Sequence, residues 1–88
     1  MMKIKYEFAV SEVAGESIAV SIAPEHHSVV VTLNNSARFM WELLVAGTDI
    51  EAMTVALMDK YDGLDQETAR AEAEEFVEML RSNQLLDE

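Results

Sequence analysis

The sequence predicts an α+β fold, in which a three-stranded antiparallel sheet is followed by three α-helices within a single domain of residues 1–88. Two patterns predict it. Apolar residues alternate with polar or small ones in the first third of the chain, which is the period of a strand with one buried face. From residue 35 onward they recur every three or four positions, as on the buried stripe of an amphipathic helix. Because 50% of the residues are hydrophobic, the chain is expected to form its core without metal or disulfide.

The three strands are expected at about residues 5–11, 16–22 and 28–33. Ala14-Gly15 separates the first two as a turn. Because short loops join antiparallel neighbours, the strands are expected to form a meander. The pattern leaves two possibilities open for residues 29–33, which form either an edge strand or a fully paired central strand.

The three helices are expected at about residues 35–45, 49–61 and 65–82. Each is preceded by candidate capping residues: Asn34 or Asn35, then Thr48 in a capping box with Glu51, then Asp65. Large apolar residues follow the inner stripes of the helices. Trp41 and Phe76 on these stripes are expected in the core rather than in a site.

The composition is strongly acidic, because 17 Asp and Glu residues stand against 6 Lys and Arg and give a net charge of −11. Nucleic-acid affinity depends on Lys and Arg that neutralise phosphates, so nucleic acid and anionic membranes are not expected as partners. The charge favours a partner that carries basic residues. No apolar run is long enough to span a membrane and the N-terminus is not a signal peptide, so the expected location is the cytoplasm.

Residues that could carry chemistry are not arranged for it. The chain contains no cysteine, which excludes disulfides, thiolate zinc sites and a cysteine nucleophile. His26 and His27 are adjacent and therefore do not form a helical metal-binding pair. Only three glycines occur and they form no phosphate-binding loop. The protein is therefore expected to have no catalytic activity, no cofactor and no metal site.

The order of several short motifs resembles the PqqD-like family, whose small domains recognise precursor peptides. In this sequence the motifs are Leu33-Asn34, Ala37, Trp41-Glu42-Leu43-Leu44, Gly47-Thr48, Tyr61, Phe76, Leu80 and Leu85-Leu86. One departure concerns the glycine that precedes the last leucine pair in the family, where this chain has Gln84. Asn83 tolerates the left-handed backbone conformation and is expected to end the third helix in its place.

The resemblance implies a winged helix-turn-helix-like domain that binds the leader of a ribosomally made precursor peptide. The domain would then present the precursor to a modifying enzyme of the radical S-adenosylmethionine type or another type, in pyrroloquinoline quinone synthesis or a related pathway. In related proteins the leader adds as a strand to the edge of the third strand and lies beside the third helix.

The same resemblance gives the candidate site. The strand residues expected to bind the leader are Val29, Val30, Val31, Thr32 and Leu33, which carry no charge or proline that would block pairing. The helix residues expected to face it are those at the margin of the buried stripe, Arg70, Glu74, Val77 and Arg81. A second copy of the chain competes for the same edge, so a homodimer is also possible.

A winged-helix DNA-binding regulator is the alternative function, because strands followed by helices also suit that fold. Its recognition helix needs positive charge. The third helix here offers only Arg70 and Arg81. Against them stand six acids, Asp65, Glu67, Glu72, Glu74, Glu75 and Glu78.

Overall fold

The computed structural model describes residues 1–5, 7–21 and 30–88, and its sheet is the predicted meander. The sheet has the order β2-β3-β4, with β2 at Phe8–Val13, β3 at Glu16–Ser21 and β4 at Val30–Leu33. Both pairs of neighbours are antiparallel. Ala14 and Gly15 join β2 to β3 with positive φ angles of 53° and 82°. Two left-handed residues make a turn whose twist matches the twist of the strands it connects.

The register puts alternate residues of each strand on the face that meets the helices. On β3 these are Ser17 and Ala19, which are buried and lie opposite Leu33 and Val31 of β4. Because β3 is the central strand, β4 pairs on one side only within the described part of the chain. The third predicted strand is therefore an edge strand, which decides between the two possibilities that the sequence left open.

The three helices follow in the expected order, as α1 (Asn35–Ala46), α2 (Ile50–Lys60) and α3 (Gln66–Ser82). Asn34 caps α1 and Asp65 caps α3; in each case the side-chain oxygen accepts a backbone N–H three residues on, at 2.8 Å. The predicted capping box of Thr48 and Glu51 is wrong. Asp49 caps α2, because Thr48 is held in an antiparallel bridge with Met2, through backbone hydrogen bonds of 2.7 and 2.9 Å.

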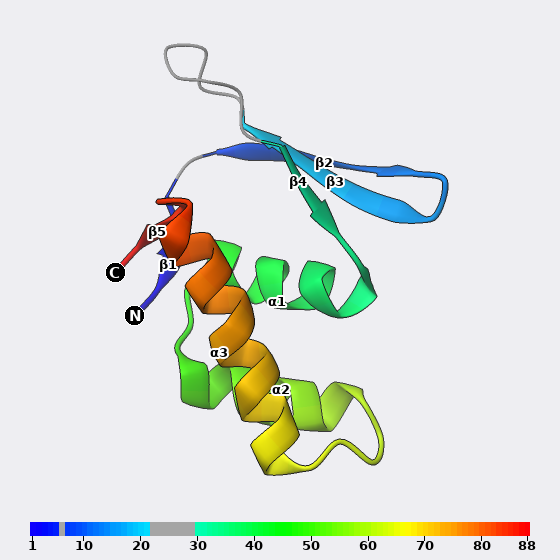
Figure 1. Ribbon diagram of the computed structural model, residues 1–88, viewed down its shortest axis with the longest axis vertical. Helices are drawn as coiled ribbons and strands as arrows, with labels where there is room; N and C mark the ends of the chain where they lie inside the picture. Colours follow the sequence, from blue (N-terminus) through cyan, green and yellow to red (C-terminus); the bar gives the residue numbers. More distant parts are fainter. Residues whose placement is uncertain (6, 22–29) are drawn as a thin grey trace.

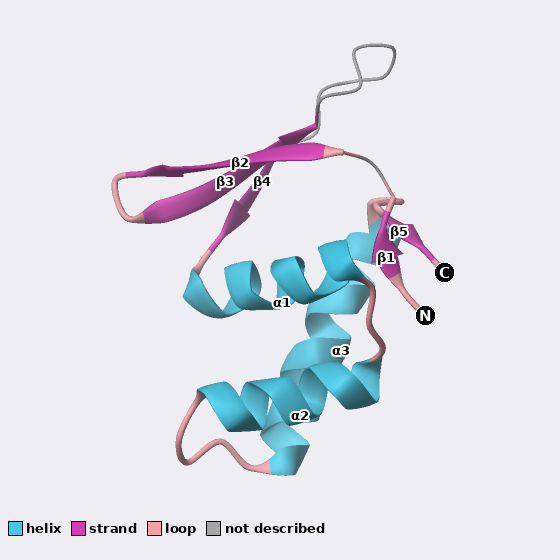
Figure 2. Cartoon of the chain, turned by 180° about the vertical axis from the view of Figure 1, so that it is seen from behind, coloured by secondary structure: helices cyan, strands magenta, loops and turns pink. Residues whose placement is uncertain are grey.

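The sheet lies over α1, α2 lies on the other side of α1, and α3 runs across both helices (Figure 1). The view from behind shows the same order, with α1 between the sheet and α2 (Figure 2). The core that joins these layers contains Leu33 from β4, Trp41 and Leu44 from α1, and Leu57 and Leu80 from the other helices. Each of these side chains is almost completely buried, as predicted for Trp41.

A second, very small sheet joins the two ends of the chain and was not predicted. In it β1 (Lys3–Ile4) pairs antiparallel with β5 (Leu86–Asp87). Leu85, just before β5, is buried and Leu86 is half-buried, so this pair folds back onto the core. The N- and C-termini consequently lie close together (Figure 1).

Asn83 follows the last residue of α3 as its C-cap, as expected, but it is not the residue in the left-handed conformation. Its φ is −96°, whereas Gln84 has a φ of 59° and is the left-handed residue. The backbone N–H of Leu85 donates to the carbonyl of Leu80 at 2.9 Å, and that of Gln84 to the carbonyl of Arg81 at 3.0 Å. These two bonds form a Schellman motif, whose left-handed position Gln84 occupies although it is not glycine. Burial of Leu85 against the core holds the motif in place.

Candidate functional site

The free edge of β4 is the first component of the candidate site. Its outward residues are Val30, with 60% of its surface exposed, and Thr32, whereas Val31 is half-buried and Leu33 is buried. Within the described residues, one side of this strand has no neighbour in the sheet. The strand contains no lysine or proline, so nothing in its sequence opposes the addition of another strand. Val29, predicted as part of the site, lies outside the described residues.

The second component is a groove of about 300 Å³ that begins where β4 ends. One wall is the start of α1 and the other is a face of α3. The lining residues are Asn34, Ser36, Ala37 and Met40 on the first wall and Glu72, Glu75, Phe76 and Met79 on the second. A further hollow of about 330 Å³ shares Ser36 and Glu72 with this groove and extends it to Tyr61 and Asp62. We call the two together the β4 groove.

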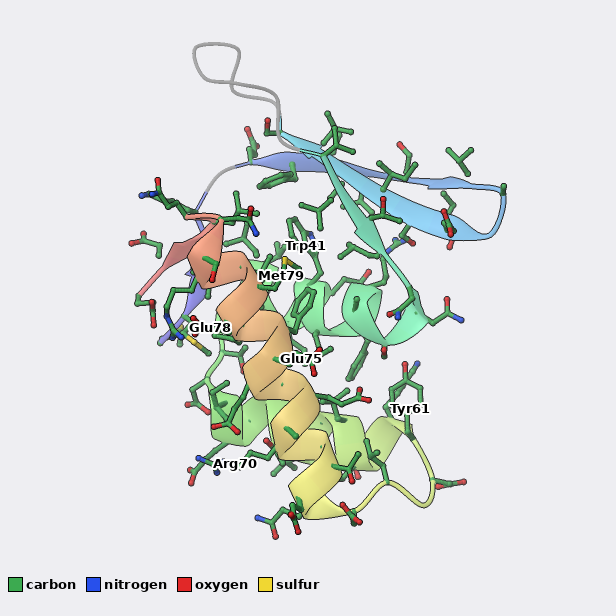
Figure 3. All side chains as sticks on the ribbon, viewed as in Figure 1. Trp41, Tyr61, Arg70, Glu75, Glu78 and Met79 are labelled. Atoms are coloured by element: carbon green, nitrogen blue, oxygen red, sulfur yellow. The ribbon has the colours of Figure 1, made fainter. Side chains whose placement is uncertain are left out.

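The helical repeat of α3 explains which residues reach the β4 groove. The buried face of α3 carries Phe76 and Leu80 among other residues. With about 100° between successive residues, Glu72, Glu75 and Met79 fall on one margin of this face. Glu75 and Met79 accordingly lie on the side of α3 turned towards α1 and β4, and Glu78 and Arg70 lie on the other side (Figure 3).

The structure does not bring the predicted residues of α3 to this groove. Val77 is buried, with 1% of its surface exposed, and belongs to the core rather than to a margin. Arg70 lies on the margin turned away from β4, in a hollow with residues of α2, where it pairs with Glu74. Arg81 pairs with Glu78 and with Glu88 near the C-terminus, each at 2.8 Å.

Reasoning from the sequence missed the residues that do line the α3 wall, which are Glu72, Glu75, Phe76 and Met79. One signal was available for Met79. Met79 extends the apolar stripe of the third helix to its margin, and it keeps 37% of its surface exposed.

The shifted pKa values belong to structural contacts outside the β4 groove. Hydrogen bonds from Thr68, chiefly from its backbone N–H, lower the pKa of the Asp65 carboxyl at the start of α3. The hydrogen bond with Arg81 likewise lowers the pKa of Glu88. Within residues 1–5, 7–21 and 30–88, no group of three or more metal-ligating side chains is placed to hold an ion. His26 and His27 lie outside these residues.

A larger hollow of about 690 Å³ lies between β2 and α1, and Arg38 and Glu42 within it are already paired. Arg38 in this hollow donates to the hydroxyl of Ser17 at 2.9 Å and pairs with Glu12 and Glu42 at 3.6 and 3.5 Å. These contacts join β2, β3 and α1. The hollow therefore includes part of the junction between sheet and helix, and its sheet residues, Phe8 and Val10, come from β2 at the other edge of the sheet.

The fold and the β4 groove define a small recognition domain of the α+β class. The chain belongs to the family of coenzyme PQQ synthesis protein D, whose sequence model matches residues 19–86. Among solved structures, TbiB1 in complex with the TbiA(beta) leader peptide is similar to it, with a TM-score of 0.75 and 20% sequence identity. The similarity covers 97% of this chain and 94% of TbiB1, and it shows a shared fold.

No curated protein matches the chain. None of the helices in the described ranges combines the length and the apolar character that crossing a membrane requires.

Proposed function

We propose that this protein binds the leader of a ribosomally made precursor peptide as an added strand on β4 and presents the precursor to a modifying enzyme. The observation that carries the proposal is the free edge of β4 together with the β4 groove, which begins at Asn34, the residue that follows β4. Membership of the family supports it, as does the shared fold with TbiB1, which was solved with a leader peptide. The chemistry is assigned to the partner enzyme, of the radical S-adenosylmethionine type or another peptide-modifying type, in the cytoplasm.

In strand addition the backbone and the side chains of the leader have different roles. The backbone of the leader pairs with the unused N–H and C=O groups of β4, which gives affinity with little dependence on sequence. Side chains of the added strand alternate between its two faces. Those on the inner face continue the row of Val31 and Leu33 and enter the β4 groove beside Phe76 and Met79. Selectivity for a leader therefore comes from this inner row.

The strand-addition step can be tested on the peptide alone. The peptide is the leader of the cognate precursor, made with an N-methyl group on one amide at a time. We expect methylation to abolish binding at alternate positions only, because every second amide of an added strand points towards β4. A loss without this period of two would contradict strand addition.

The groove can be tested with a matched pair of variants. Met79→Ala removes an apolar wall of the β4 groove, and Met58→Ala removes the same side chain from α2, where it is similarly exposed, at 40% against 37%. We expect Met79→Ala to weaken leader binding about five- to tenfold, as is typical for an interface residue worth about 1 kcal/mol or more. Met58→Ala should bind as the wild type does. If both variants bind the leader with equal affinity, the β4 groove is not part of the binding site.

The alternative of a DNA-binding regulator has no support in the comparisons. α3 would have to enter the major groove, and it carries five glutamates against two arginines that are already paired with acids. Titration with duplex DNA at moderate salt should give no binding. Saturable binding that weakens with salt would favour the regulator over the peptide-binding protein.

A second copy of the chain is the competitor for the same edge. If two copies pair through β4, the mass in sedimentation should rise with protein concentration. The leader should then dissociate the dimer, because both partners need the same backbone groups. If the dimer binds the leader without dissociating, then either the dimer contact or the leader-binding site lies away from β4.

A further inference from the structure

We infer that the β4 groove selects a basic leader, one whose inner row places an apolar side chain over Phe76 and Met79 and a lysine or arginine beside Glu72 and Glu75. The inference rests on the proposed function and adds the chemical class of the ligand. Three observations carry it: the pairing of acids on α3, the position of the cations of the chain, and the order of side chains along the groove.

The acids of α3 are not equivalent. On the margin turned away from β4, Glu74 pairs with Arg70 at 3.8 Å and Glu78 pairs with Arg81 at 2.8 Å. On the groove margin, Glu72 and Glu75 have no salt bridge within the described residues. Both arginines of the helix thus pair with acids on the margin turned away from β4. The two carboxylates on the groove margin have no such partner among the described residues.

The other cations also lie elsewhere in the described structure. Arg38 points to the opposite side of α1, where it pairs with Glu12 and Glu42. Lys60 lies over the ring of Phe39, 5.5 Å from its centre. Lys3 and Lys5 belong to the N-terminal segment at β1. No Lys or Arg lines either part of the β4 groove as described, and Asp62 adds a third carboxylate at its far end.

The carboxylates of this groove repel one another and repel an acidic ligand, so they weaken its binding. They attract a basic ligand and strengthen its binding. A side chain that lies against Glu72 or Glu75 is within one Debye length of that carboxylate, about 8 Å at physiological ionic strength. A leader lysine can lay its aliphatic stem on Met79 while its ammonium group reaches a carboxylate. A leader with Asp or Glu in this place would add to the repulsion that the net charge of −11 already causes.

The order of the side chains predicts a spacing in the leader. Along α3 the apolar part of the wall is Phe76 and Met79, and the acidic part is Glu75 and Glu72. From Met79 to Glu75 the helix rises about 6 Å, and to Glu72 about 10 Å. Residues on one face of a strand are about 6.7 Å apart. The basic residue is therefore expected two or four positions from the apolar one, on the same face of the added strand.

The test uses a random peptide library displayed on phage and selected against the full-length protein. We expect the selected peptides to share an apolar residue and, two or four positions away, a lysine or arginine. Their affinity is then measured for Glu72→Gln, Glu75→Gln and the double variant. The matched control is the double variant Glu74→Gln and Glu78→Gln, which removes the same charge from the other margin of the same helix.

Each groove substitution should weaken binding about two- to fivefold, because exposed ion pairs contribute modestly. The control variant should stay within twofold of wild type at about 0.15 M salt, since its charges are screened from the groove. A selected peptide with its lysine replaced by glutamate should recover affinity on Glu72→Lys or Glu75→Lys. Recovery on the swapped pair would assign the contact to those two residues.

The outcomes separate the inference from the proposed function. Selected peptides that lose affinity on Met79→Ala but carry no basic residue would overturn the inference and leave peptide binding at the groove intact. Basic peptides that bind the groove variants and the control equally well would also overturn it. A library that yields no peptide above background would count against both.

Discussion

The contact between Phe8 of β2 and Trp41 of α1 gives a sharp test of how the sheet is attached to the helices. The two rings meet edge to face, with 4.9 Å between their centres and 89° between their planes. Trp41 keeps only 1% of its surface exposed. Phe8→Leu preserves an apolar side chain of similar size but removes this geometry. β2 lies outside residues 19–86, the segment that the family model matches, so the contact also tests the strand that the match leaves out.

The expected cost is set by two contributions. An aromatic pair in this arrangement is worth about 0.5–1.5 kcal/mol beyond the area it buries. A hydrophobic exchange of similar volume usually costs less than about 1.5 kcal/mol. We therefore expect Phe8→Leu to lower the free energy of unfolding by about 1–2 kcal/mol. A domain of 88 residues has roughly 4–13 kcal/mol in total, so the variant should still fold.

Urea denaturation is the assay, and the fluorescence of Trp41 reports on it because Trp41 is the single tryptophan of the chain. Val13→Ala serves as the control. It lies on the same strand with 57% of its surface exposed and should change stability by less than about 0.5 kcal/mol. If Phe8→Leu costs no more than Val13→Ala, the ring contact does not hold the sheet on α1. The reasoning from Phe8 and Trp41 would then be refuted.

Three further predictions concern the helix ends. Asn34→Ala removes the acceptor for the N–H of Ala37 and should lower stability by about 1 kcal/mol, or the melting temperature by about 4–8 °C, with Asn34→Asp close to wild type. The pKa of Asp65 is lowered in the folded state, so its carboxylate stabilises the fold above its ordinary pKa of 3.8 and this stabilisation is lost as the pH falls through the folded pKa. In urea titrations, wild type should therefore lose more stability than Asp65→Asn between about pH 6 and pH 3. Gln84→Gly should raise the melting temperature by relieving a left-handed cost of about 1–2 kcal/mol, less the added backbone entropy, whereas Asn83→Gly, at a φ of −96°, should lower it.

The elements of the fold were predictable because their patterns are local. Alternation and helical spacing gave the three strands of the main sheet and the three helices, with ends within a few residues of β2, β3, α1, α2 and α3. The pairing of β1 with β5 was not predictable. A strand of two residues has no period, and its partner lies at the other end of the chain.

The predictions for single residues at helix ends were wrong for a similar reason. Thr48 has a side chain that can cap a helix, but its backbone forms an antiparallel bridge with Met2, which is distant in the sequence. Gln84 is not a residue that favours the left-handed conformation, yet it adopts it because Leu85 must turn into the core. In both cases a tertiary contact overrides the local preference.

Of the two components of the candidate site, the edge strand was predictable from the sequence and the margin of α3 was not. The composition of residues 30–33 indicated an unprotected strand, and the sheet order makes β4 an edge. The buried stripe of α3 was also predicted, but a stripe has two margins that the sequence does not distinguish. Which margin is turned towards α1 and β4 depends on how α3 crosses α1, and this crossing turns Glu75 and Met79, rather than Arg70, to that side.

An unprotected edge on β4 is also a hazard, because strands of neighbouring molecules can stack on it. This chain has no lysine or bulge on β4 to prevent such contact, but each molecule carries a net charge of −11. Mutual repulsion then supplies colloidal protection at long range and leaves the edge open at short range. Added salt weakens that protection and also weakens the attraction of a basic leader. Ionic strength therefore moves the competition for β4 away from the leader and towards other copies of the protein.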